Sequence, residues 1–137
     1  SRQEPSPYDV CIIGLSYEDR QALYDRIGLR VDQMLRDGLL EEAERILSSP
    51  LSVTSAQAIG YKELRGHFSG ECSLEEAAEN IKRETRRYAK RQLTWFRRDA
   101  RIQWILCDKA GGPVGVFDRA IEIVRLWEAR RTGEKPV

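Results

Sequence analysis

The sequence predicts an α/β fold that is mostly helical and contributes two strands to a parallel sheet. Two short apolar segments, VCIIGL at residues 10–15 and IQWIL at residues 102–106, are predicted as these strands. A long stretch of helical pattern separates them. Two strands cannot bury both faces of a sheet. We therefore expect an incomplete core domain whose other strands lie upstream, in keeping with a chain that begins Ser-Arg-Gln rather than Met.

Composition restricts the class of protein. With 41% hydrophobic and 33% charged residues, the 137-residue chain is globular rather than disordered. Because the net charge is only +1, any basic surface must be confined to one region of the protein. Three widely spaced cysteines and a single histidine support neither a disulfide framework nor a zinc site, which favours the reducing cytoplasm. The sequence contains neither a signal peptide nor an apolar run near the ~20 residues of a membrane span.

Helix signals follow the first strand in order. Ser16 with Asp19 forms a capping signal, and apolar residues at helical spacing continue to Gly38, a plausible C′ glycine. Residues 39–47 then form a short amphipathic helix, which ends at Ser-Ser-Pro in residues 48–50.

Helix caps and turn residues also mark the helices of the second half of the sequence. Residues 56–68 give a weaker helical pattern, and Ser73 with Glu76 forms a capping box that opens a long helix. After the second strand, a Gly-Gly-Pro turn at residues 111–113 leads into an amphipathic helix over residues 116–130.

The long helix carries the most informative stretch, KRETRRYAKRQLTWFRR at residues 82–98. Its eight basic side chains fall between about 0° and 180° when counted at about 100° per residue from Lys82. Only Glu84 interrupts the positive run. A face of one charge repels itself unless a polyanion neutralises it, so this face predicts nucleic-acid binding. A solvated charged face is the alternative.

The other polar and aromatic positions of this helix allow two interpretations. Tyr88, Trp95 and Phe96 map to the apolar side, so we expect core packing rather than base stacking. Gln92 and Thr94 can hydrogen-bond to RNA, or can be neutral helix positions.

Two further features suggest phosphate contacts. Gly60 interrupts a helical pattern at a cost of about 1 kcal/mol relative to Ala, which favours either a close approach of backbone or phosphate, or a helix boundary. Arg26 and Arg30 lie one turn apart on the helix after the first strand, where they can clamp a diphosphate or form a solvated face. Since no glycine-rich phosphate motif and no nucleophile–base set occurs, the sequence shows no catalytic group.

Four stretches together closely resemble the tRNA dimethylallyltransferases, also called tRNA isopentenyltransferases. The resemblance runs from about residue 7 to 105, and the order of QAIGYKEL and AKRQLTWFRR is its most specific part. It is carried by YDVCIIGL, RIGLRVDQMLRDGLLEEAERIL, QAIGYKEL and KRETRRYAKRQLTWFRRDARIQWI.

The resemblance implies a P-loop NTPase-like parent with an inserted helical domain that grips the anticodon arm. Such enzymes transfer a dimethylallyl group from dimethylallyl diphosphate to N6 of the adenosine 3′ of the anticodon, and Mg²⁺ assists the diphosphate. Their glycine-rich phosphate loop and catalytic Asp belong to an N-terminal half that this sequence does not contain. We therefore expect no catalytic residue and no metal ligand here, and no transfer by this chain alone.

The resemblance also implies particular binding residues. Family tRNA contacts map onto residues 57–62 and 90–97, and Arg30, with Arg26, matches arginines near the diphosphate. Together with the basic face, the predicted tRNA-binding residues are Gln57, Ala58, Ile59, Gly60, Tyr61, Lys62, Arg86, Lys90, Arg91, Gln92, Thr94, Trp95 and Arg97.

The domain organisation expected on this basis has four parts. Residues 1–9 are a linker, residues 10–108 the C-terminal part of the transferase core with its tRNA-facing helices, residues 109–131 a turn and helix, and residues 132–137 a frayed tail. The expected partner is a tRNA anticodon stem-loop, with no DNA or membrane, and the expected state is a cytoplasmic monomer. A non-catalytic helical RNA-binding module and a helical adaptor for an acidic protein are the alternatives.

Overall fold

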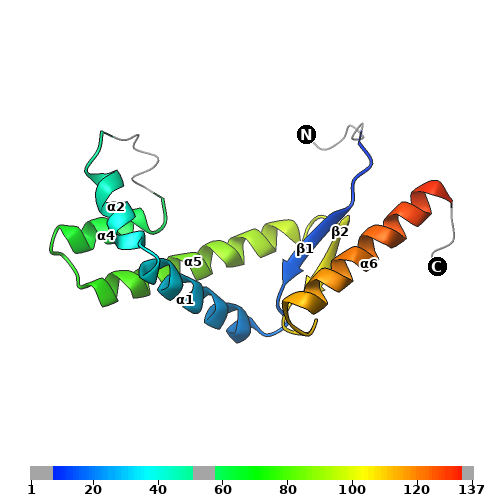
Figure 1. The fold of residues 1–137 in the computed structure, drawn as a ribbon, viewed down its shortest axis with the longest axis horizontal. Helices are drawn as coiled ribbons and strands as arrows, with labels where there is room; N and C mark the ends of the chain where they lie inside the picture. Colours follow the sequence, from blue (N-terminus) through cyan, green and yellow to red (C-terminus); the bar gives the residue numbers. More distant parts are fainter. Residues whose placement is uncertain (1–7, 51–57, 134–137) are drawn as a thin grey trace. The chain divides into compact units, whose positions relative to one another are not determined.

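The computed structural model describes residues 8–50 and 58–133, and this part of the chain is mostly helical (Figure 1). The chain forms two compact units, unit 1 from residues 1–22 and 93–137 and unit 2 from residues 23–92. The predicted fold class, mostly helical with two parallel strands, is confirmed. The elements in order are β1 (Ile12–Ser16), α1 (Arg20–Arg36), α2 (Leu39–Leu47), α4 (Tyr61–Phe68), α5 (Leu74–Phe96), β2 (Ile102–Leu106) and α6 (Gly112–Thr132).

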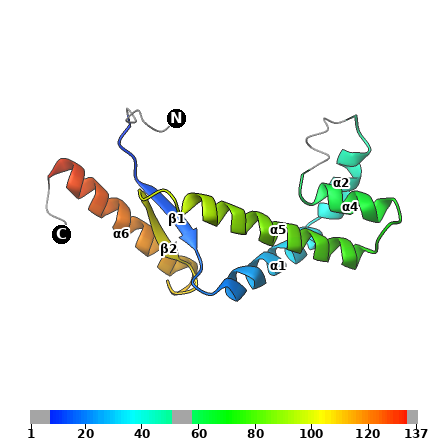
Figure 2. The ribbon, with the colours of Figure 1, turned by 180° about the vertical axis from the view of Figure 1, so that it is seen from behind.

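In unit 1, β1 and β2 lie side by side as a parallel pair next to α6 (Figures 1 and 2). The register places Ile12 opposite Ile102 and Ser16 opposite Leu106. α6 packs on β2, and Ile105 and Ile123 are buried in unit 1. β1 begins two residues later than predicted and is half-buried rather than buried on both faces, because the described sheet has only two strands.

Position 14 of β1 has room only for glycine, because side chains of β2 lie very close to its backbone. A Cβ at this position would lie 2.6 Å from the Trp104 ring and 2.7 Å from the Ile102 side chain. The indole of the neighbouring strand therefore fills the space that a side chain at position 14 would need.

The start of α1 is capped differently from the prediction. Ser16 is wrong as a cap, because it is the last residue of β1 and its carbonyl accepts a hydrogen bond from the Cys107 N–H at 2.8 Å. Asp19 does cap the helix, accepting from the Gln21 N–H at 3.0 Å. The turn before α1 is also bonded to the segment that follows β2. There the Asp108 carboxylate accepts hydrogen bonds from the N–H groups of Glu18 at 2.9 Å and Asp19 at 3.0 Å. These backbone hydrogen bonds lower the pKa of Asp108.

In unit 2, four helices share one core. The Tyr61 hydroxyl donates to Glu42 at 3.1 Å and joins α4 to α2. Burial and this hydrogen bond raise the pKa of Tyr61. The buried cluster takes side chains from all four helices, namely Val31, Leu39, Ala43, Leu64, Ala77 and Ile81.

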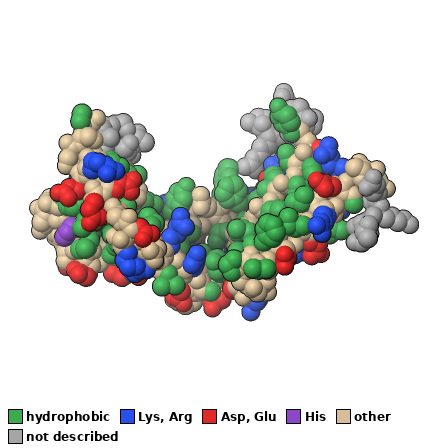
Figure 3. Space-filling view, in the orientation of Figure 1, with side chains coloured by type: hydrophobic (Ala, Val, Ile, Leu, Met, Phe, Trp, Pro, Cys, Tyr) green, Lys and Arg blue, Asp and Glu red, His purple; other side chains and the backbone are tan. Residues whose placement is uncertain are grey.

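Two other helix boundaries bear on the predictions. The predicted cap of the long helix is confirmed, because Ser73 Oγ accepts from the Glu76 N–H at 3.0 Å. α6 begins at Gly112, four residues before the predicted position, with Pro113 in its first turn. Apolar side chains crowd the surface over α6 (Figure 3), and Val114 and Phe117 are exposed there. Among the described residues, no helix is long and apolar enough to cross a bilayer.

We expect Gly14→Ala to lower the free energy of unfolding by about 1–3 kcal/mol, because the added methyl group overlaps the Trp104 ring. Urea unfolding measures this change. Gly28→Ala is the matched control: its Cβ would have only an ordinary 3.9 Å contact with Lys82, and Ala is the better helix former. Equal effects of the two substitutions would contradict the packing assigned to Gly14.

Asp108 predicts a pH dependence of stability. Its pKa is depressed in the folded protein, so its contribution is present above the unfolded value of about 3.9 and is lost as pH falls through the folded value. We expect Asp108→Asn to destabilise the protein at pH 6, with a gap to wild type that narrows as pH falls below 4. Asp118→Asn, at an exposed position of α6, is the control. A gap that is the same at all pH values would contradict the role of the Asp108 charge.

Candidate nucleic-acid interface

α5 carries more of the predicted RNA-binding residues than any other element, namely Arg86, Lys90, Arg91, Gln92, Thr94 and Trp95. Its buried side chains, Ala77, Ala78 and Ile81, all fall in its first half. The helix ends at Phe96 rather than at the predicted Arg98. Arg97 lies in the turn that follows, where its N–H donates to the Leu93 carbonyl at 3.0 Å.

The basic face of α5 is not free of acidic partners, and this part of the sequence interpretation is wrong. Lys82 Nζ lies 2.8 Å from Asp32 of α1 and 3.5 Å from Glu79, and its side chain is only 16% exposed. The hydrogen bond to Asp32 raises the pKa of Lys82. Arg87 pairs with Glu84 at 2.9 Å. Lys82 therefore joins α5 to α1 and is not available to an outside polyanion.

Arg86, Lys90 and Arg91 are further cations of this face in unit 2. The Arg86 guanidinium lies over the Tyr24 ring of α1 at 5.7 Å and is half-buried. Lys90 and Arg91 are exposed, with Arg91 5.9 Å from the ring of Tyr88. The exposed ammonium and guanidinium groups are the kind that contact phosphates.

The aromatic residues of α5 do not form a core in the described chain. Tyr88, Trp95 and Phe96 are 47%, 53% and 46% exposed, so the predicted core packing is wrong. The physical reason is that the shared core of unit 2 contacts only the first half of the helix. Arg98 lies 5.6 Å from the Trp95 ring. An exposed indole beside a guanidinium can stack on an unpaired base.

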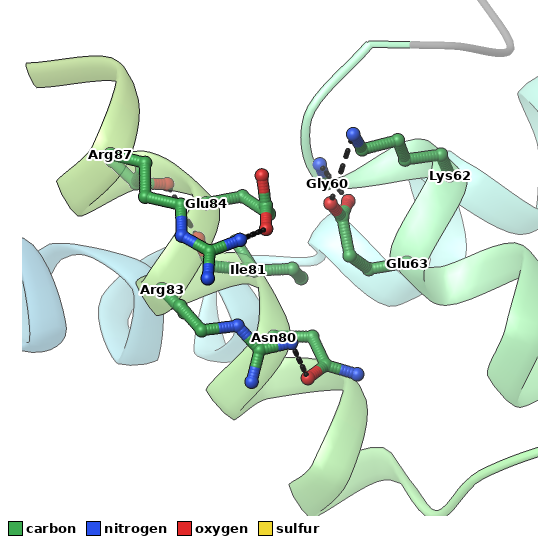
Figure 4. Close-up of polar contacts among 9 residues, drawn as sticks. Gly60, Lys62, Glu63, Asn80, Ile81, Arg83, Glu84 and Arg87 are labelled. Carbon is green, nitrogen blue, oxygen red and sulfur yellow. Dashed lines mark hydrogen bonds and ion pairs between the residues drawn. The ribbon is translucent and has the colours of Figure 1, made fainter. Parts of the chain in front are cut away.

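The second predicted tRNA-binding stretch lies at the start of α4. Gly60 immediately precedes the helix with φ of 101°, a backbone conformation that favours glycine, so its role is that of a helix boundary. Its N–H donates to Glu63 at 2.8 Å, and Lys62 Nζ lies 3.8 Å from the same carboxylate (Figure 4). Ala58, Ile59 and Lys62 are exposed, and Tyr61 is half-buried. Gln57 lies outside the described residues.

The two stretches are brought together within unit 2. α4 and α5 share the core through Leu64 and Ile81. Figure 4 shows Gly60, just before α4, and Lys62 of α4 in one view with Glu84 and Arg87 of α5. Both helices contribute exposed cations to unit 2, Lys62 on α4 and Lys90 and Arg91 on α5.

Arg26 and Arg30 lie elsewhere on unit 2. Tyr24 and Asp32 of α1 contact α5, and Gly28 lies between them against Lys82. Each arginine is two residues from Gly28, which places it about 160° around the helix from that contact. Both side chains are exposed. The structure does not bring them to the α4–α5 surface.

Sequence reasoning missed the ion pair between Arg87 and Glu84 on α5. The signal was present, since Glu84 is the single acidic residue in the basic run and stands at i,i+3 to Arg87. Within the described ranges, no group of three or more His, Cys, Asp or Glu side chains is placed to hold a metal ion.

Comparison with known proteins supports the resemblance. The family model described as IPP transferase matches residues 1–99. A tRNA dimethylallyltransferase of Lactococcus lactis is 47% identical over 119 residues, covering 87% of this chain and 40% of the relative. Another, from Streptococcus agalactiae, is 52% identical over 101 residues, covering 74% of this chain and 34% of the relative.

Solved structures agree with these sequence matches. The full-length tRNA isopentenylpyrophosphate transferase of Bacillus halodurans superposes with a TM-score of 0.75 at 41% identity, covering 93% of this chain and 42% of that one. The Staphylococcus epidermidis tRNA isopentenylpyrophosphate transferase gives 0.74 at 37% identity, covering 85% and 38%. This chain spans about two fifths of these relatives, or less. With a family model matching residues 1–99 and relatives that agree in sequence and fold, the chain belongs to the IPP transferase family.

Proposed function

We propose that this chain is the tRNA-binding C-terminal part of a tRNA dimethylallyltransferase. The complete enzyme transfers a dimethylallyl group from dimethylallyl diphosphate to N6 of the adenosine 3′ of the anticodon. One observation supports the tRNA-binding role above the others: α4 and α5, which share one core, both expose cations in a chain of this family.

The surface has the chemistry that RNA binding needs. Lys62, Lys90 and Arg91 expose positive charge, which supplies affinity through phosphate contacts and counterion release. Unit 1 by itself offers a second kind of contact, the exposed ring of Trp95. Single-stranded loops are bound in this way, by charge along the backbone and by stacking of unpaired bases.

The diphosphate has a separate candidate site on α1. Arg26 and Arg30 expose guanidinium groups one turn apart, a spacing suited to two phosphate groups. The described residues do not fit a Mg²⁺ site, because they place no cluster of oxygen ligands. We propose that the phosphate loop, the catalytic Asp and the groups that hold Mg²⁺ lie in the N-terminal half of the enzyme.

A second candidate function is a non-catalytic RNA-binding module. The observation that favours it is the lack, in the sequence, of any recognisable nucleophile–base set or phosphate-binding motif. Both candidates use the same RNA surface and differ only in whether transfer chemistry accompanies it.

The test uses labelled dimethylallyl diphosphate, Mg²⁺ and an anticodon stem-loop carrying the target adenosine. The full-length Bacillus halodurans transferase is the positive control. We expect transfer by that enzyme, and binding of the stem-loop without transfer by this chain. Transfer by this chain alone would contradict the assignment of the chemistry to the N-terminal half. Failure to bind the stem-loop would contradict the tRNA-binding role.

Trp95→Ala separates base stacking from packing. Because the side chain is half-exposed, we expect a loss of unfolding free energy below the about 3–5 kcal/mol of a core Trp. We expect the free energy of stem-loop binding to weaken by about 1–3 kcal/mol. Urea unfolding and fluorescence anisotropy measure the two effects. Phe117→Ala, an exposed aromatic of α6, is the control, and an equal loss of RNA affinity there would contradict stacking by Trp95.

A further inference from the structure

Glu84 is the one acidic residue within the basic run of residues 82–98. Its Oε1 lies 2.9 Å from Arg87 Nη1, and its side chain is 25% exposed while that of Arg87 is 61% exposed. In Figure 4, the Glu84 carboxylate points toward the start of α4, where Gly60 and Lys62 lie. A partly covered negative charge therefore stands inside the surface proposed to bind RNA.

This position has an electrostatic consequence. A phosphate that approaches Arg87 meets a guanidinium already paired with a carboxylate, and it is repelled by that carboxylate. An RNA that places a hydroxyl or base amino group at the same point meets a hydrogen-bond acceptor instead. The pair thus distinguishes the two kinds of group that RNA can present.

We propose that Glu84 is a specificity-determining residue of the RNA surface, an internal competitor that keeps Arg87 from binding the phosphates of arbitrary RNA. The proposal rests on the proposed function and deepens it. Phosphate-rich single strands lose one cation contact, whereas a structured loop that presents a donor near the start of α4 keeps its affinity. Selectivity comes from a repulsive element as well as from attractive contacts.

The same helix contains a matched pair for comparison. Glu79 and Lys82 have the same i,i+3 spacing and a distance of 3.5 Å. Lys82 is also bonded to Asp32 at 2.8 Å and is mostly covered, so neutralising Glu79 leaves it paired. Glu79→Gln removes one negative charge from α5 without releasing a cation, which makes it the control for Glu84→Gln.

The experiment measures dissociation constants of the intact chain for oligo(U) and for the anticodon stem-loop over a range of salt concentrations. We expect Glu84→Gln to bind oligo(U) about fivefold to tenfold more tightly, with a log K against log salt slope steeper by about 0.7. We expect its stem-loop affinity to change less than about twofold, and Glu79→Gln to alter neither ligand by more than that. The proposal would be overturned if Glu84→Gln and Glu79→Gln bound oligo(U) equally well. It would also be overturned if Glu84→Gln bound oligo(U) more weakly than wild type, because Glu84 would then be a positioning residue for Arg87.

A double variant tests whether Arg87 carries the gain. In Glu84→Gln/Arg87→Gln the added oligo(U) affinity should disappear, and a retained gain would overturn the proposal in favour of a general charge effect. Urea unfolding of each variant excludes loss of fold as the cause. A wild-type chain that binds neither RNA would overturn the proposed function itself, whereas wild-type binding with no difference between the two glutamate variants overturns this inference alone.

Discussion

The surface of unit 2 depends on the ion pair between Lys82 of α5 and Asp32 of α1. Lys82 is largely covered and bonded at 2.8 Å, so the pair joins α5 to α1 alongside the core to which Ala77 and Ile81 belong. Arg86, one turn later, lies over Tyr24 on the same side. These contacts hold Lys82 and Arg86 against α1, whereas Lys90 and Arg91 later in the helix are exposed.

The positive charge of this protein acts at particular surfaces, because the chain as a whole is almost neutral. The net charge of +1 gives no general attraction for RNA, so affinity must come from the few cations that the fold leaves exposed. Of the basic residues on α5, Lys82 is largely covered by its pair with Asp32, whereas Arg87, Lys90 and Arg91 are exposed. Under the proposed function, shape and aromatic contacts supply the rest of the RNA affinity.

Local signals predicted most of the elements, and long-range contacts account for what was missed. Ser73 was identified as a cap because its partner is three residues away. Asp108 was not identified, because the backbone groups that it binds lie about ninety residues earlier in the chain. Helical periodicity placed Trp95 on an apolar face but could not show that the shared core ends before it. Gly60 was correctly singled out, and only the backbone angle shows that it precedes a helix.

The division of the chain into units has a consequence for the order of folding. Unit 2 is one continuous segment, whereas unit 1 is assembled from the two ends of the chain. Pairing β1 with β2 in a parallel sheet closes a loop that contains all of unit 2, and closing a long flexible loop costs entropy. A unit 2 that is already folded shortens this loop and reduces that cost. During synthesis, β1 cannot pair with β2 until all of unit 2 has been made, so this pairing is a late step that a folded unit 2 makes easier.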